Sequence, residues 1–201
     1  AWTTPAGEPL RVSLVQGNIP QDMKWLTEMQ QPTIDIYAHL SSGEWDRDLI
    51  VWPESAIPAY LHEVQPLVEA LQAQARAHGN TVVTGIPYVV RHEGRLVYHN
   101  TVLGIDGDAV AMYHKVNLVP FGEFVPFAEA FRAIAPFFSL PMMPLDGFSP
   151  GADDQPPLRA GNTALAPLVC YEVGYADYVR RNAARAGILL TVSNDAWFGG
   201  S

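Results

Sequence analysis

The sequence contains a single cysteine, Cys170, so no disulfide bond can form within the chain. A lone cysteine is either an inert buried residue or a nucleophile, and the count by itself favours the inert interpretation. Charged residues make up only 16% of the chain, the formal net charge is −9, and clusters of basic residues are missing. Because phosphate groups are bound mainly by Lys and Arg, we expect no nucleic-acid partner.

Long apolar runs are also missing. No segment reaches the ~20 apolar residues that a membrane-spanning helix needs. Residues 1–9 lack the basic start and the apolar centre of a signal peptide, and they lack an initiator Met. With 48% hydrophobic residues in a chain of 201, the composition is that of a globular domain with a sizeable core. We therefore expect one folded domain, excised or processed from a longer protein.

Strand-like and helix-like segments alternate along the chain. Strands are predicted over residues 11–16, 48–52, 81–86, 96–105, 109–113, 163–170 and 188–193, and helices over residues 27–40, 64–78 and 175–186. The segment 48–52 is almost wholly apolar, as expected of a strand buried on both faces. Asp106-Gly107 indicates a hairpin, and Pro167 is expected to interrupt its strand. The alternation predicts an α/β layered sandwich.

The segment 121–148 is rich in Phe and Met. Its composition favours a core helix over residues 128–135 with a tethering loop. The alternative is an apolar arm that meets lipid or lines an acyl pocket. Residues 141–157, rich in Pro, Gly and Asp, are predicted to form a loop.

Reactive side chains follow three predicted strands. Glu54 comes after residues 48–52, Lys115 after residues 109–113, and Cys170 ends the strand 163–170. Taken singly, they could be a turn cap, a solvated charge and a small core residue. Sites in open α/β sheets form beyond the carboxyl ends of strands, so their joint placement points to one shared site.

Four ordered blocks of sequence carry a family resemblance: residues 48–58 (DLIVWPESAIP), 113–124 (YHKVNLVPFGEF), 168–172 (LVCYE) and 193–199 (SNDAWFG). In these blocks the chain resembles the nitrilase, or carbon-nitrogen hydrolase, superfamily. It most resembles the periplasmic domain of the apolipoprotein N-acyltransferases, because LVPFGEFVP and the Phe- and Met-rich stretch follow Lys115. The resemblance implies a nitrilase-like α-β-β-α sandwich over residues 11–201 that lacks its last elements, with residues 1–10 as a tail or linker.

The resemblance also implies the role of each site residue. Glu54 would be the general base, Lys115 the oxyanion stabiliser, Cys170 the nucleophile, and Glu123 a second glutamate that positions the lysine. Because a carboxylate is too weak a base for a thiol unless burial raises its pKa, we expect Glu54 to be buried. The residues expected to contact substrate are Phe124, Tyr171, Glu172 and Trp197.

The implied reaction is a two-step acyl transfer. A phospholipid donates its acyl chain to Cys170, and the thioester then passes it to the N-terminal amine of a diacylglyceryl-cysteine apolipoprotein. The expected location is the periplasmic side of a bacterial inner membrane, at the membrane surface, in a membrane-embedded and monomeric parent protein. We expect neither a metal nor a cofactor.

Two other functions remain open. One is a soluble nitrilase-type amidase or carbamoylase, which would release ammonia from small amides without needing lipid. The other is a non-enzymatic binding domain, in which Cys170 would be buried and unreactive.

Overall fold

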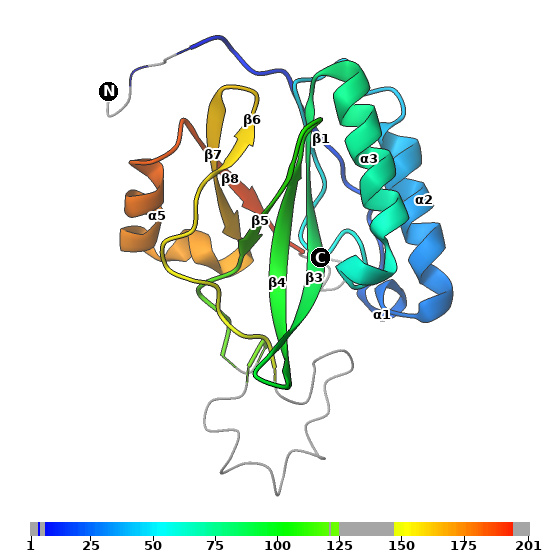
Figure 1. Cartoon of the computed structure of the whole chain (residues 1–201), viewed down its shortest axis with the longest axis vertical. Coiled ribbons are helices and arrows are strands. Elements are labelled where there is room, and N and C mark those ends of the chain that lie inside the picture. The colour runs from blue at the N-terminus through cyan, green and yellow to red at the C-terminus, as the bar shows by residue number, and fades with distance from the viewer. Residues whose placement is uncertain (1–3, 5–6, 121, 125–146, 195–201) are drawn as a thin grey trace, which may run out of the picture.

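The computed structural model describes residues 4, 7–120, 122–124 and 147–194, and two β-sheets form its centre (Figure 1). The larger sheet has the order β1 (Val12–Leu14), β2 (Leu49–Val51), β3 (Thr81–His92), β4 (Arg95–Ile105) and β5 (Val110–His114). Its first three strands run parallel, whereas β3, β4 and β5 pair antiparallel. The smaller sheet consists of β6 (Leu158–Ala160), β7 (Thr163–Val169) and β8 (Ile188–Val192).

Helices cover the outer faces of the two sheets (Figure 1). The larger sheet carries α1 (Gln21–Lys24), α2 (Gln30–Ser41) and α3 (Gln65–His78), and the smaller sheet carries α5 (Ala176–Ala183). Short 3₁₀ helices cover Thr27–Met29, Leu61–Glu63 and Cys170–Gly174. The layers are therefore helix, sheet, sheet and helix, which confirms the predicted sandwich. Within the described ranges, none of the helices has the length and apolar character needed to cross a bilayer.

Strand β2 shows why its sequence is apolar at every position. Leu49 and Val51 pack between the two sheets, whereas Ile50 and Trp52 face the helices. The Trp52 ring stacks on Tyr37 of α2, with 5.2 Å between ring centroids. Each fully buried aliphatic or aromatic side chain contributes about 1.5–3 kcal/mol to folding. Strand β2 thus contributes to both hydrophobic cores. This packing fixes the start of the turn that follows the strand.

Most of the predicted strands and helices are confirmed, with shifts at their ends. The largest extension is β3, which continues to His92 and forms a long hairpin with β4. The helix predicted to reach residue 186 ends at Ala183. The predicted interruption at Pro167 is wrong, because β7 pairs through this residue with Leu190 of β8.

Other predictions concern loops and short elements. Residues 147–157 have no helix or strand, in agreement with the predicted loop. The predicted helix over residues 128–135, and most of the Phe- and Met-rich segment, lie outside the described residues. Neither α1 nor β6 was predicted, because elements of three or four residues are too short to show a periodicity.

Gly85 allows the turn after β2 to lie against β3. A Cβ atom at this position would lie 2.7 Å from the Cα of Glu54. The turn is joined to β3 by two hydrogen bonds, from the N–H of Gly85 to the carbonyl of Pro53 and from the N–H of Ile57 to the carbonyl of Gly85. The missing side chain of Gly85 therefore decides where Glu54 is held.

We predict that Gly85→Ala destabilises the domain and displaces Glu54. The new methyl group would meet backbone atoms, which cannot rotate away, so we expect a loss of about 1–3 kcal/mol. Urea unfolding measures this loss. Gly43→Ala is the matched control, because no heavy atom lies within 4 Å of a Cβ at that position. Equal stability of the two variants would contradict the prediction.

Candidate active site

Glu54 occupies the turn after β2 and is 8% exposed, which confirms its predicted burial. Its Oε1 accepts a hydrogen bond of 2.7 Å from the Asn100 side chain, and its Oε2 accepts one of 3.0 Å from the backbone N–H of Asn194. The Lys115 ammonium lies 4.0 Å from Oε1. Both oxygens of this carboxylate are therefore oriented by donors from other elements.

Lys115 is 1% exposed and directly follows β5. Its Nζ lies 2.7 Å from Oε2 of Glu123. The backbone of Lys115 is also fixed on both sides, because its N–H donates to the carbonyl of Asn100 and its carbonyl accepts from Gly151. A buried ammonium needs such a partner, since burial without one disfavours the charged form.

Asn100, on β4, bridges the two glutamates. Its amide nitrogen donates to Oε1 of Glu54 at 2.7 Å and to Oε1 of Glu123 at 2.9 Å. Glu123 also accepts from the N–H of Val119 at 2.9 Å, which orients its second oxygen beside Lys115. The sequence analysis did not identify Asn100. The available signal was a carboxamide in a strand whose other residues are mostly apolar.

Burial raises the pKa of Glu54, and this is the largest influence on it. The positive charge of Lys115 and the hydrogen bonds from Asn100 and Asn194 act in the opposite direction, while the negative charge of Glu123 adds to the rise. A carboxylate with a raised pKa is a stronger base. The environment of Glu54 therefore suits proton transfer better than that of a solvated glutamate would.

Cys170 stands at the end of β7 and begins a 3₁₀ helix. Cys170 is partly buried, and its φ of 51° lies in the left-handed region. Ser55, beside Glu54, has a similar backbone conformation with a φ of 49°. Strained backbone of this kind gathers at functional sites. The neighbouring strand β8 pairs with β7 up to Val192, and Asn194 lies just beyond it in contact with Glu54. The strand ends next to Cys170 and Glu54 are thus linked.

Glu172 links the Cys170 segment to the Lys115 segment. It is fully buried, and its Oε1 accepts from the N–H groups of Val116 and Asn117 at 2.8 and 3.0 Å. Its Oε2 accepts from the Tyr113 hydroxyl and from the N–H of Val169, both at 2.8 Å. With its four acceptor bonds made inside the protein, Glu172 has the geometry of a positioning residue, in place of the substrate contact expected for it.

The other expected substrate contacts differ in exposure. Tyr171 is 57% exposed and packs edge-on against Tyr175. Phe124 is half-buried, in the short turn after Lys115. Trp197 lies outside the described residues. Of the described side chains in this set, the Tyr171 ring, directly after Cys170, is therefore the most open to a ligand.

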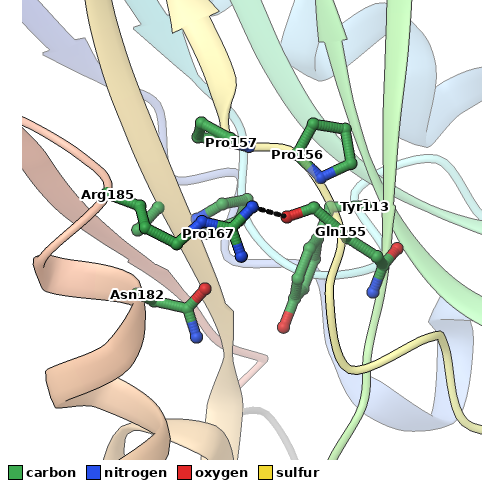
Figure 2. A pocket seen from close by; sticks show the side chains of 8 residues that line it. Tyr113, Gln155, Pro156, Pro157, Pro167, Asn182 and Arg185 are labelled. Carbon is green, nitrogen blue, oxygen red and sulfur yellow. Dashed lines mark hydrogen bonds between the residues drawn. The ribbon is translucent and has the colours of Figure 1, made fainter.

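A small pocket between β5, β7 and α5 is separate from this cluster. Figure 2 shows its lining, which includes Tyr113, Pro167, Asn182 and Arg185, and the Arg185 side chain donates to the carbonyl of Gln155 at 3.2 Å. None of the predicted catalytic side chains lines it. Its residues instead hold the loop before β6 against β5. The pocket is therefore not part of the Glu54 cluster.

Comparison with known proteins identifies the class of this domain. The family model described as carbon-nitrogen hydrolase matches residues 11–201, and the chain belongs to that family. Over its whole length it is 43% identical to the apolipoprotein N-acyltransferase of Vibrio parahaemolyticus and 40% identical to that of Pseudomonas putida. It spans 40% and 39% of the lengths of these two relatives.

Solved structures support the same fold. A carbon-nitrogen hydrolase from Helicobacter pylori superposes with a TM-score of 0.60 at 17% identity, covering 92% of this chain and 59% of that one. An amidase of the nitrilase superfamily from Nesterenkonia gives a TM-score of 0.56 at 24% identity, covering 94% of this chain and 66% of that one. At such identities the likeness is one of fold alone.

We predict that Glu172→Gln strongly destabilises the domain. In the variant, one acceptor oxygen of residue 172 is replaced by an NH₂ group, which cannot accept hydrogen bonds. The buried donors that faced this oxygen lose their acceptor, and we expect a loss of about 3–5 kcal/mol in the free energy of unfolding. Thermal or urea unfolding measures the change. Glu44→Gln is the matched control, because the ion pair of Glu44 with Arg47 lies at the surface, with 33% and 37% of the two side chains exposed, and contributes little. A change in Glu172→Gln as small as in the control would contradict the positioning role.

We also predict that Asn100→Leu shifts the pH dependence of Cys170 reactivity to higher pH. The variant loses the hydrogen bond that favours ionised Glu54, so the pKa of Glu54 rises further and its carboxylate is protonated over a wider acidic range. The rate of Cys170 alkylation by iodoacetamide, measured against pH, tests this. Asn80→Leu is the matched control, a buried asparagine bonded to the Trp45 carbonyl. An unchanged profile in Asn100→Leu would count against Glu54 as the base.

Proposed function

We propose that this domain transfers a fatty acyl chain from a phospholipid, through a thioester on Cys170, to the N-terminal amine of a diacylglyceryl-cysteine apolipoprotein. The observation that carries the proposal is the identity of 40–43% over the whole chain to relatives named apolipoprotein N-acyltransferase. The amidase-like solved structures fall below this identity. The buried cluster of Glu54, Lys115 and Glu123 supplies the groups that such chemistry needs.

In the first step Glu54 takes the proton of the Cys170 thiol as sulfur attacks the ester carbonyl. The tetrahedral intermediate carries an oxyanion, which the Lys115 ammonium and the backbone N–H of Tyr171 stabilise. One such donor contributes about 3–4 kcal/mol to a transition state in other enzymes. The ester C–O bond then breaks, Glu54 returns its proton to the leaving oxygen, and a lysophospholipid departs from the acyl-Cys170 thioester.

In the second step the uncharged amine of the lipid-modified cysteine attacks the thioester. A carbon–nitrogen bond forms, the carbon–sulfur bond breaks, and Glu54 accepts the proton that the nitrogen loses. Water competes with the amine at this stage, so a transferase has to shield the thioester. The Phe- and Met-rich composition of residues 121–148 suits such a cover and a wall for the acyl chain, and Phe124, Tyr171 and Trp197 are the proposed contacts to the lipid substrates.

The proposed setting is the periplasmic surface of a bacterial inner membrane. A phospholipid donor and a lipidated acceptor are both membrane-bound, so the reaction takes place at a bilayer surface. The parent protein is proposed to be embedded in that membrane and to act as a monomer. The names of the relatives support the lipoprotein substrate and the phospholipid donor in general terms.

We predict that an enzyme of the relatives' full length that contains this domain gains one fatty acyl group on Cys170 when it is incubated with phospholipid. Intact-mass spectrometry followed by peptide mapping detects the adduct. Cys170→Ala should show no adduct. Lys115→Met should acylate at least 100-fold more slowly, since it loses an oxyanion donor.

The released product distinguishes this proposal from the amidase alternative. Ammonia release from small amides, with no lipid adduct on Cys170, would replace the proposed function by hydrolysis. The binding-domain alternative predicts two results. Cys170 would be alkylated no faster in the folded protein than in the unfolded chain, and phospholipid would give no acyl adduct.

A further inference from the structure

A second buried lysine lies beside the candidate base. Lys24 is the last residue of α1 and is 3% exposed. Its Nζ donates to the backbone carbonyl of Glu54 at 3.3 Å and lies 5.9 Å from the centre of the Trp25 ring. The sequence analysis did not predict a role for Lys24, because this residue lies outside the family blocks that contain the reactive residues.

A second side chain of α1, Gln21, contacts a residue bonded to Glu54. The Oε1 atom of Gln21 accepts a hydrogen bond of 3.0 Å from the Asn194 side chain. The backbone N–H of Asn194 donates to Oε2 of Glu54, also at 3.0 Å. One face of α1 therefore holds both the main chain of Glu54 and a residue that orients its carboxylate.

Burying the charged Lys24 ammonium costs desolvation free energy, and a side chain that only filled space would not need this charge. Burial lowers its pKa to about 8, while the negative charge of Glu54 raises it. A well-packed apolar side chain of similar length would avoid this desolvation. Among the described residues, the charged side chains near the Glu54 carboxylate are Lys115 after β5 and Glu123 in the turn that follows, while Lys24 of α1 contacts the Glu54 backbone carbonyl. Two ammonium groups and two carboxylates thus gather in this described part of the site.

We propose that Lys24 is a positioning residue of the acyl-transfer site, which fixes the backbone of Glu54 and, together with Gln21 and Asn194, aims its carboxylate. The inference rests on the proposed function. The backbone at Ser55 is in the left-handed region, so the turn that carries Glu54 is strained and needs external contacts. Gly85 supports this turn from β3, and Lys24 supports it from α1.

The decisive variant is Lys24→Met, which keeps the length of the side chain and loses its charge and donors. We expect the single-turnover acylation of Cys170 to slow at least tenfold, with an unchanged KM for phospholipid. We also expect the acidic limb of the pH profile to move to higher pH, because the carboxylate of Glu54 loses a neighbouring positive charge. Lys24→Arg keeps the charge and should retain the wild-type limb.

Asp22→Asn is the matched control, an exposed position on the same helix, and it should leave the rate and profile unchanged. If Lys24→Met lowers only the unfolding temperature and keeps the wild-type rate and profile, Lys24 is a packing residue and the proposal falls. If that variant does not fold, Gln21→Leu carries the test. A slower acylation at unchanged KM supports the proposal, and a wild-type rate contradicts it.

A parallel readout separates this inference from the proposed function. Alkylation of Cys170 by iodoacetamide needs no substrate, and its pH profile should shift in Lys24→Met in the same direction as the acylation profile. If the wild-type enzyme forms no acyl adduct while the alkylation profile still shifts, the acyltransferase proposal falls and the positioning role of Lys24 stands. An unshifted alkylation profile overturns the positioning role whatever the substrate is.

Discussion

The rest of the site depends on the ion pair between Lys115 and Glu123. The Lys115 ammonium is 1% exposed, and a buried charge without a partner is costly, so the Glu123 carboxylate at 2.7 Å stabilises it. Asn100 then joins Glu123 to Glu54 through one amide nitrogen. The Lys115 ammonium offsets the repulsion between these two carboxylates. Glu54 has the less direct contact to positive charge, which suits the proton transfer proposed for it.

The two sheets are joined at the same place where the reactive residues gather. Glu172 accepts hydrogen bonds from Val116 and Asn117, which follow Lys115 just beyond β5 of the larger sheet, and from Val169, next to Cys170 at the end of β7 in the smaller sheet. Its bond to the Tyr113 hydroxyl extends this contact to Tyr178 of α5. In the described part of the chain the two sheets share no hydrogen-bonded strands, so the buried Glu172 carboxylate is a polar link between them. A change in the packing of the sheets would move Lys115 relative to Cys170.

Local pattern accounted for the layers, because buried strands are visible as apolar runs. It also placed Glu54, Lys115 and Cys170 after strands, whereas Glu123 was predicted from the family resemblance alone. Local pattern could not reveal Asn100, Asn194 or Lys24. Their roles come from contacts between segments far apart in the sequence, and an isolated Asn or Lys is usually a surface residue. The predicted interruption of β7 at Pro167 was wrong because a proline within a strand usually marks an end or an edge of the sheet. The role of Glu172 was also hidden, since adjacency to Cys170 suggested substrate contact.

The hydrogen bond between Asn194 and Glu54 spans 140 positions of the chain. Contacts of such sequence separation form late in folding, because a long loop has to close before they are gained. During synthesis from the N-terminus, β2 and its turn emerge well before β8. Glu54 therefore reaches its final hydrogen bonding only after nearly the whole domain has docked. In the proposed reaction, a partly folded chain would carry the Cys170 thiol while the Glu54 carboxylate is still incompletely oriented, which would delay acyl transfer until folding is complete.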